Sequence, residues 1–415
     1  MKKWLIGCVL TLSCQTVAFA ETKLEVMTPA GNYMNFVRSV VVPEFNKLYP
    51  DVKVVVSNDE NLETRMAAGD LPNLYAGVFG YQPAKYAKMG KLAYFEQFDG
   101  YQELIDRIDP VFLRKNFGRS YYIPWSATTQ LMIYNRELFL EAGLDPDQPP
   151  RTWDEFLYAA EKINQLPPRK DGSPVYGTVF WNDVLSSGSW YWGMLAQLYY
   201  NFNEGEFTLL NRFGTHPVFD KDEANMATFL ATMQQAQKFA PLTMEKSFFS
   251  RNIGMWPQFG FGWKANLQEA AQRPMVVGED VGLAPIPTLT KNETSYSTLD
   301  GRALMIFKNT IEVEQLSWEF VQLLMGDEMN HRANVELGQL PVLTELQDRP
   351  YYQSKEAKPF VDQLPYTIMS EPFSQSADVA TILLQQYSKV VLKNEITAEV
   401  AVESASKQAK KIFVH

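Results

Sequence analysis

The fold is decided by three extended segments near the N-terminus: KLEVM at residues 23–27, DVKVVVS at residues 51–57 and LYAGVF at residues 74–79. The second segment alternates and is rich in β-branched residues, as strands are. Between the three segments lie two stretches with apolar side chains at helical spacing, residues 36–48 and 62–68. The order strand, helix, strand, helix, strand is typical of a parallel, doubly wound α/β sheet.

Ligands of such sheets bind beyond the carboxyl ends of the strands. The loops at residues 31–33 and 80–82 are therefore candidate ligand loops. Downstream, residues 121–135 (YYIPWSATTQLMIYN) are rich in strand-forming residues, and Thr152 with Glu155 forms a capping box that begins a helix. Further strands are expected at residues 176–180, 281–285 and 303–307, and further helices at residues 222–239, 311–325, 376–392 and 396–412.

The first twenty residues have the pattern of a secretory signal peptide. Two lysines follow the initial Met, an uncharged stretch comes next, and Ala18-Phe19-Ala20 supplies small residues where a signal peptidase reads them. We therefore expect residues 1–20 to be removed and the mature chain to begin at Glu21. A membrane anchor fits less well, because the apolar run is shorter than the ~20 residues of a spanning helix. A lipoprotein is the other alternative, since residues 5–8 (LIGC) resemble a lipobox, but this motif lies too early.

Composition narrows the possible chemistry of the mature chain. Cys8 and Cys14 both lie in the leader, so neither a disulfide nor a cysteine nucleophile is expected. A mature length of about 395 residues exceeds one ordinary domain and suggests two. Loss of the two leader lysines changes the net charge from −10 to −12. Because phosphate backbones are bound by clustered Lys and Arg, we expect no nucleic-acid partner. No later segment is apolar enough for stable membrane insertion.

Common enzyme signatures are missing from the sequence. There is no GxSxG, GxxxxGK[ST], HExxH or GxGxxG motif. The three histidines, His216, His331 and His415, have no partner at metal-ligand spacing. We expect no catalytic residue, no metal and no cofactor. Glycoside hydrolysis needs only two carboxylates, so the 48 acidic residues leave a secreted glycan-cleaving enzyme open as an alternative.

Aromatic residues make up 13% of the chain. Trp153 and Trp318 lie within amphipathic helices, and we expect them to be packing residues. Six other tryptophans lie at strand ends or in loops, where an exposed ring can stack on the flat apolar face of a ligand. Sugars offer such faces through their C–H groups. A core position is the alternative for each of these six: Trp125, Trp181, Trp190, Trp192, Trp256 and Trp263.

Short motifs occur along the mature chain in a fixed order. They are Phe45 with Tyr49, Pro50, Val52 and Val54; Gly69, Pro72 and Asn73; Gly90 and Leu92; a long run from Tyr122, Pro124, Tyr134 and Asn135 to Thr152, Trp153 and Glu155; Gly301 with Ile306; residues 318–324; and residues 338–342. Their order resembles the extracellular solute-binding proteins, family 1, which feed sugar ABC importers. Asn73 and Asp300 depart from the family pattern, which has Asp and Gly there.

The resemblance implies two α/β lobes, each with a mostly parallel sheet flanked by helices, and a ligand cleft between them. Residues 21–127 with 286–325 would form lobe one, and residues 128–285 with 326–415 would form lobe two. It also implies a periplasmic protein, expected to be a monomer, that captures a mono- or oligosaccharide and delivers it to the permease of an ABC importer. A polyamine or a metal is the alternative solute.

The same resemblance implies which residues line the cleft. Amides at Asn32 and Gln82 stand where many sugar binders place carboxylates, and Arg302 could pair with an acidic group of a uronate-containing sugar. Arg302 could equally bridge the lobes on the surface. The expected ligand-binding residues are Asn32, Tyr33, Tyr81 and Gln82 from one lobe, Trp181, Asn182, Phe261 and Trp263 from the other, and Trp125, Ser126, Asp300 and Arg302 near the crossings.

Overall fold

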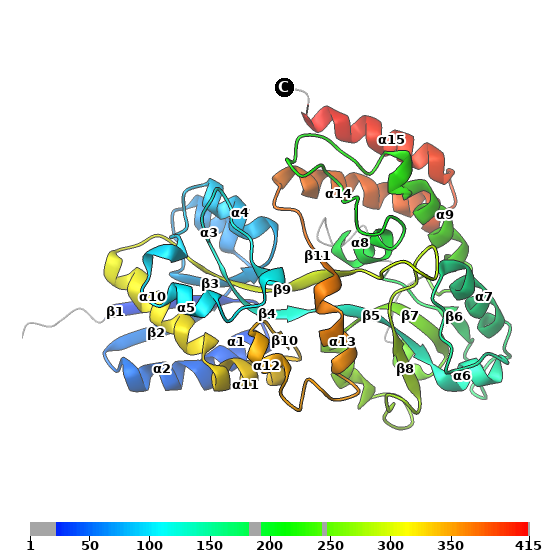
Figure 1. Cartoon of the computed structure of the whole chain (residues 1–415), viewed down its shortest axis with the longest axis horizontal. Helices are drawn as coiled ribbons and strands as arrows, with labels where there is room; N and C mark the ends of the chain where they lie inside the picture. The colour runs from blue at the N-terminus through cyan, green and yellow to red at the C-terminus, as the bar shows by residue number, and fades with distance from the viewer. Residues whose placement is uncertain (1–21, 182–191, 243–246, 414–415) are drawn as a thin grey trace, which may run out of the picture.

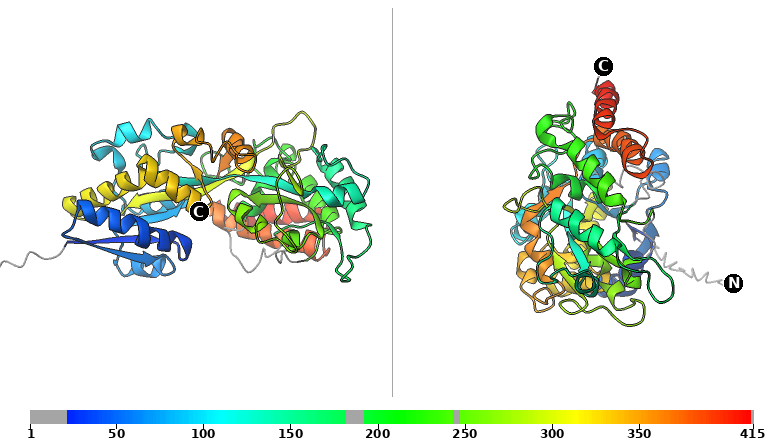
Figure 2. Two further views of the ribbon diagram at one scale, coloured as in Figure 1. Left: turned by 90° about the horizontal axis from the view of Figure 1, so that it is seen from below. Right: turned by 90° about the vertical axis from the view of Figure 1, so that its right-hand side faces the viewer.

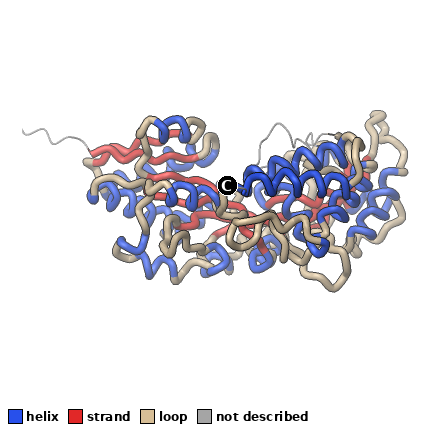
Figure 3. Tube along the Cα trace, turned by 90° about the horizontal axis from the view of Figure 1, so that it is seen from above, coloured by secondary structure: helices blue, strands red, loops and turns tan. Residues whose placement is uncertain are grey.

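The computed structural model describes residues 22–181, 192–242 and 247–413. They form two lobes, each built on a β-sheet with helices packed against it, as the tube in Figure 3 shows. The predicted two-lobed α/β fold is therefore confirmed. The expected signal peptide and the expected loop residues Asn182 and Trp190 lie outside the described residues. Among the described residues, no helix is long and apolar enough to cross a membrane.

The first lobe begins with the three strands that the N-terminal pattern predicts. β1 (Thr22–Thr28) pairs in parallel with both β2 (Val52–Asn58) and β3 (Leu74–Val78). The remaining members of this sheet come from distant parts of the chain: β4 (Ile123–Thr128), β9 (Ser297–Ile306), β10 (Leu340–Pro341) and β11 (Thr367–Met369). The helices of this lobe are α1 (Asn32–Phe36), α2 (Val42–Leu48), α3 (Leu62–Ala67), α4 (Tyr81–Lys88), α5 (Tyr101–Ile105), α10 (Ile311–Met325), α11 (Asp327–Leu337) and α12 (Thr344–Gln347). α13 (Lys358–Asp362) lies between the two lobes (Figure 1).

The second lobe has a four-stranded sheet in the order β6-β7-β5-β8. Its strands are β5 (Gln130–Asn135), β6 (Tyr176–Thr178), β7 (Ile253–Gly260) and β8 (Val281–Ala284). Its helices are α6 (Arg136–Glu141), α7 (Trp153–Asn164), α8 (Trp192–Tyr200), α9 (Met226–Gln237), α14 (Ser374–Tyr387) and α15 (Ala398–Lys410). The C-terminal helices α14 and α15 pack on this lobe (Figure 2), and α15 packs against α9 and α14.

The expectation of a mostly parallel sheet in each lobe is wrong. In the second sheet, β5 is antiparallel to both β7 and β8, and only β6 and β7 are parallel. In the first sheet, β9 is antiparallel to β3 and β4 and parallel to the short strand β11. The cause is the way in which the chain passes between the lobes (Figure 1). β4 of the first sheet continues directly into β5 of the second, and β8 of the second sheet is followed by β9 of the first. These strands are therefore not joined to their neighbours by right-handed βαβ units, which would make them parallel.

The lobe boundary expected at residue 325 also differs from the structure. β10 pairs with β4 in the first sheet, and the Asn330 side chain of α11 donates to the backbone carbonyl of Trp125 at 3.2 Å. Leu346 of α12 belongs to the same hydrophobic core as the first sheet, whereas Phe360 of α13 contacts Phe259 and Phe261 of the second lobe. The chain therefore stays with the first lobe well beyond residue 325, and Val379 and later apolar residues join the second core.

Local packing predictions fare better. Thr152 caps α7 by accepting a hydrogen bond from the backbone N–H of Glu155 at 3.2 Å. Trp153 on α7 and Trp318 on α10 are buried, as the amphipathic patterns predict. Trp318 stacks on Phe98 with ring centroids 5.5 Å apart.

Candidate functional site

Two neighbouring strands carry the chain between the lobes (Figure 1). β4 and β9 are antiparallel, and their register places Ser126 opposite Arg302 and Thr128 opposite Asp300. Gly301 lies between these pairs, where a Cβ atom would be only 2.0 Å from the carbonyl oxygen of Ser126. Glycine is therefore required for the two strands to approach. Because alternate residues of a strand share a face, Asp300 and Arg302 project to the same side.

Further hydrogen bonds fix the crossing point. The backbone N–H of Gln130, the first residue of β5, donates to the hydroxyl of Ser297, the first residue of β9, at 2.9 Å. The hydroxyl of Thr129, between β4 and β5, donates to the backbone carbonyl of Phe360 at 2.8 Å. Both crossing strands are thus tied to each other and to α13.

Tyr33, Trp125 and Arg302 meet on the first-lobe side of the crossing. Tyr33 lies at the start of α1, just past the carboxyl end of β1, and its ring meets the Trp125 indole edge-on with centroids 5.6 Å apart. The Arg302 guanidinium lies over the Tyr33 ring, 5.0 Å from its centroid. This is a cation–π arrangement. Three of the predicted site residues, from three separate segments, are therefore brought together.

The electrostatics of this group keep Arg302 charged and Tyr33 neutral. Burial raises the pKa of Tyr33, and the charge of Arg302 only partly opposes this. Burial lowers the pKa of Arg302, but Tyr33 and Asp300 outweigh it, so that the pKa lies above its ordinary value. Of the described carboxylates, none forms an ion pair with Arg302. Asp300 is exposed and accepts instead from the backbone N–H of Gly301 at 2.7 Å.

The sequence did not single out Tyr75 or Asp59, which adjoin this group. The Tyr75 hydroxyl donates to Asp59 at 3.1 Å, and burial raises the pKa of Tyr75. Tyr75 lies in β3 within an otherwise apolar run, LYAGV. A tyrosine in a buried strand was the available signal, since its hydroxyl needs a polar partner.

Three tryptophans form a cluster on the second-lobe side of the crossing. Trp263, in the short helix η7 (Phe261–Leu267), lies 5.6 Å from Trp181 and 5.6 Å from Trp256 between ring centroids. Trp181 and Trp263 are partly exposed, whereas Trp256 is fully buried. Trp263 also reaches the crossing itself, because its ring, Gln130 and Thr128 all lie within 4 Å of the position that a Cβ atom on Gly260 would take.

Several buried polar atoms at the crossing have no hydrogen-bond partner within the described part of the chain. They include the indole N–H of Trp125 and the amide oxygen of Gln130. Gln130 is only 6% exposed. Each such atom costs about 1–3 kcal/mol unless a partner is supplied. The position of Gln130 beside the partly exposed ring of Trp263 indicates a site that accepts a ligand with both apolar faces and polar edges.

The expectation that the loop tryptophans are exposed is wrong for three of them. Trp125 and Trp256 are 0% exposed and Trp192 is 7% exposed. Trp125 lies in β4, between β10 and β9 of the first sheet, at a shift in register between Pro124 and Ser126. Trp256 lies within β7, among Phe248, Phe249 and Phe259. A strand end places a ring on either face of the sheet, and the local pattern does not say which face is covered.

The remaining predicted residues are less closely associated. Asn32 is exposed at the first position of α1. The side-chain oxygen of Gln82 accepts from the backbone N–H of Val78 at 2.7 Å, so it stabilises the turn into α4. Phe261 differs from the expectation: it is buried against Phe360, with centroids 5.3 Å apart, because it faces α13. The side chain of Tyr81 and all of Asn182 lie outside what the structure describes.

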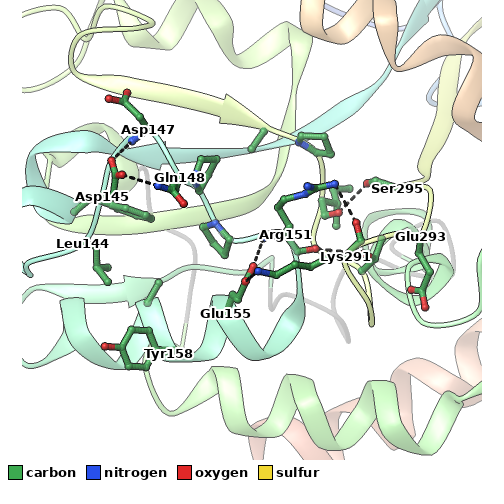
Figure 4. Close-up of a pocket in the computed structure, with 18 residues that line it drawn as sticks. Leu144, Asp145, Asp147, Gln148, Arg151, Glu155, Tyr158, Lys291, Glu293 and Ser295 are labelled. Atoms are coloured by element: carbon green, nitrogen blue, oxygen red, sulfur yellow. Dashed lines mark hydrogen bonds and ion pairs between the residues drawn. The ribbon is translucent and has the colours of Figure 1, made fainter.

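A cavity of about 640 Å³ lies elsewhere, within the second lobe between α6, α7 and residues 284–295 (Figure 4). Both of its cations are already engaged. Lys291 contacts Glu155 at 2.5 Å, and Arg151 donates to the backbone carbonyl of Lys291 at 3.0 Å. This cavity is therefore a weaker candidate for a ligand site than the crossing. Nowhere in the described residues do three His, Cys, Asp or Glu side chains gather as metal ligands.

Comparisons with known proteins agree with this architecture. The family model for bacterial extracellular solute-binding proteins matches residues 30–331. The chain is 22% identical to an sn-glycerol-3-phosphate-binding periplasmic protein of Yersinia pestis, over 91% of this chain and 83% of that protein. It is 25% identical to a maltotriose-binding protein of Pyrococcus abyssi, over 74% of this chain and 63% of that protein.

A solved structure supports the fold independently. The cyclic alpha-maltosyl-1,6-maltose binding protein of Arthrobacter globiformis superposes with a TM-score of 0.77 at 20% identity, covering 95% of this chain and 99% of that one. At this identity the similarity establishes the fold.

Proposed function

The chain belongs to the bacterial extracellular solute-binding protein family, and from this premise we propose that it captures a carbohydrate, a mono- or oligosaccharide, in the periplasm. It then delivers the carbohydrate to the permease subunits of an ABC importer. The ligand lies between the lobes, against the crossing strands β4 and β9. The protein acts as a monomer and closes over its ligand by rotation about these strands.

The observation that carries this proposal is the composition of the crossing. Partly exposed Trp181 and Trp263 offer flat apolar faces, and Gln130, whose amide oxygen has no partner in the described residues, lies beside Trp263. A sugar matches both features, because its C–H faces stack on indole rings while its hydroxyls both donate and accept hydrogen bonds. The two relatives named above bind a trisaccharide and a polyol phosphate by their names, and both ligands are rich in hydroxyls.

The rival solutes find less support. A polyamine needs several carboxylates near the aromatic rings. On the paired stretch of β4 and β9, Asp300, opposite Thr128, is a single exposed carboxylate, which is too little for a polycation. A hard metal ion needs carboxylate or imidazole ligands together with its other oxygen ligands. The described residues contain no group of three such side chains.

A thermal-shift screen tests the choice of solute. The mature protein is heated with neutral sugars, acidic sugars, polyols, spermidine and divalent metals in separate wells. A ligand present at 100 times its Kd adds about 2.7 kcal/mol to the free energy of unfolding, which raises Tm measurably. We expect a carbohydrate to do this. A rise with spermidine or a metal alone, and with no carbohydrate, contradicts the proposal.

We also infer that the chain binds its solute without changing it. Chromatography of the bound carbohydrate after a long incubation checks this. Intact ligand is expected, whereas cleavage that co-purifies with the protein and scales with its concentration supports the glycan-cleaving alternative.

A further inference from the structure

We propose that the solute carries an anionic group, a carboxylate or a phosphate, and that Arg302 binds this group. The proposal deepens the proposed function and rests on it. It is drawn from the position and the surroundings of one guanidinium at the crossing between the lobes.

Arg302 lies where a solute between the lobes would meet both crossing strands. It belongs to β9, opposite Ser126 of β4 and opposite Val78 at the carboxyl end of β3. Its guanidinium is held over the Tyr33 ring at 5.0 Å, and Tyr33 is in turn held edge-on by the buried Trp125. The cation is therefore fixed in place by packing, without depending on an acidic partner for its orientation.

Two other enclosed arginines of this chain, Arg251 and Arg65, are each paired with a carboxylate. Arg251 lies 3.4 Å from Asp280, with both side chains 7% exposed. Arg65 lies 2.7 Å from Glu25, with side chains 22% and 12% exposed. Arg302 has no such ion pair among the described residues, although it is partly buried. Tyr33 and Asp300 favour the charged guanidinium electrostatically, but neither forms an ion pair with it. A carboxylate or phosphate of the solute would supply this missing counter-ion in a place that is largely withdrawn from water.

The acidic groups around Arg302 are engaged elsewhere. Asp300 is exposed and accepts from the backbone N–H of Gly301 at 2.7 Å. Asp59 accepts from the Tyr75 hydroxyl at 3.1 Å. Tyr33 and Tyr75 are both neutral, because burial raises the pKa of each. The guanidinium therefore keeps donors for a ligand, and its planar fork matches a carboxylate or a phosphate in two-point contact.

The test compares matched acidic and neutral solutes by isothermal titration calorimetry. Glucuronate and glucose 6-phosphate are compared with glucose, and glycerol 3-phosphate with glycerol; oligosaccharides are compared with their uronate-containing counterparts. We expect at least one acidic solute to bind about tenfold or more tightly than the neutral solute with which it is matched, since a charge-assisted contact is stronger than a neutral one. Comparison of the carboxylate and phosphate sets identifies which anion is recognised.

Variants separate Arg302 from a general effect of charge. Arg302→Gln should lower the affinity for the acidic solute by about 100-fold or more, and Arg302→Lys by less, since Lys keeps the charge without the fork. The control is Arg332→Gln, which makes the same charge change at an exposed residue of α11 paired with Glu336. Its affinity should equal that of the unaltered protein. If Arg302→Gln fails to fold, the loss of affinity in Arg302→Lys carries the test.

The outcomes separate this inference from the proposed function. If a neutral sugar binds as tightly as its acidic match, or if both Arg302 variants keep full affinity, the anion inference is wrong and the carbohydrate function stands. If spermidine or a metal binds and no sugar or polyol phosphate does, the proposed function is wrong and the anion inference falls with it.

Discussion

Trp263 and Trp256 are a matched pair on which the proposed site can be tested. Both belong to one aromatic cluster, with ring centroids 5.6 Å apart, but Trp256 is fully buried and Trp263 is partly exposed. If Trp263 stacks on a sugar, its removal should weaken binding far more than folding. Removal of Trp256 should do the opposite, because its ring contacts the core and not the solute.

The magnitudes follow from the surroundings of each ring. Trp256 has Phe248, Phe249 and Phe259 within 6.3 Å between centroids, in addition to its two tryptophan neighbours. Replacement of such a core aromatic by Ala costs about 3–5 kcal/mol of stability. Among the described residues, Trp263 pairs with two aromatic rings, those of Trp181 and Trp256, and each such pair contributes about 0.5–1.5 kcal/mol beyond area burial. We therefore expect Trp263→Ala to lose about 1–3 kcal/mol of stability, which is clearly less.

The assay measures both properties on the same preparations. Thermal unfolding gives the stability of each variant, and titration monitored by intrinsic fluorescence gives its affinity for the carbohydrate found in the screen. Trp263→Ala should lose about 1–3 kcal/mol of binding free energy or more, as expected for an aromatic anchor, together with most of the fluorescence change. The reasoning is refuted if Trp263→Ala lowers Tm as much as Trp256→Ala while its folded fraction binds with full affinity.

Two further predictions concern stability. Hydrogen bonds from Arg65 outweigh the effect of burial and lower the pKa of Glu25, so this pair stabilises the fold above the unfolded-state pKa and loses its effect as the pH falls through the folded-state pKa. Glu25→Gln should therefore cost about 1–3 kcal/mol at pH 7 in urea titrations. The cost should shrink as the pH is lowered through the folded-state pKa of Glu25, and a cost that does not change with pH contradicts the reasoning. Gly301→Ala should destabilise the fold by more than about 1–3 kcal/mol, because the new Cβ would lie 2.0 Å from the carbonyl oxygen of Ser126. The control is Gly193→Ala, in a helix where a Cβ meets open space, which should leave Tm unchanged or raise it. Similar losses of Tm in the two variants would exclude the steric explanation.

Local patterns predicted the parts of the fold that local forces determine. The parallel strands β1, β2 and β3 and the Thr152 cap follow from periodicity and side-chain chemistry over a few residues. The placement of α11 and β10 did not follow, because it depends on pairing with β4, more than 200 residues earlier. Motif order gave the two lobes, but the boundary between them is set by such long-range contacts.

The candidate site was harder to predict for a related physical reason. A tryptophan at a strand end is chemically the same whether it faces the core, as Trp125 and Trp256 do, or the crossing, as Trp263 does. The stronger signal was polarity in an apolar setting. Gln130 begins the buried strand QLMIYN, and its unpartnered oxygen lies at the crossing. A polar side chain that a strand buries without need is a better marker of a binding site than an aromatic one.

The position of these residues also bears on how the protein would respond to its solute. Arg302 and Gln130 are carried by β9 and β5, so any rotation of one lobe against the other moves the crossing strands that hold them. A solute that contacts Arg302 on one side and Trp263 on the other would gain both contacts only at one angle between the lobes. Differential binding of that kind is what allows a ligand to shift a protein toward one conformation. The close contact at Gly301, which keeps β4 and β9 together, would then let the two crossing strands bend as one unit rather than separately.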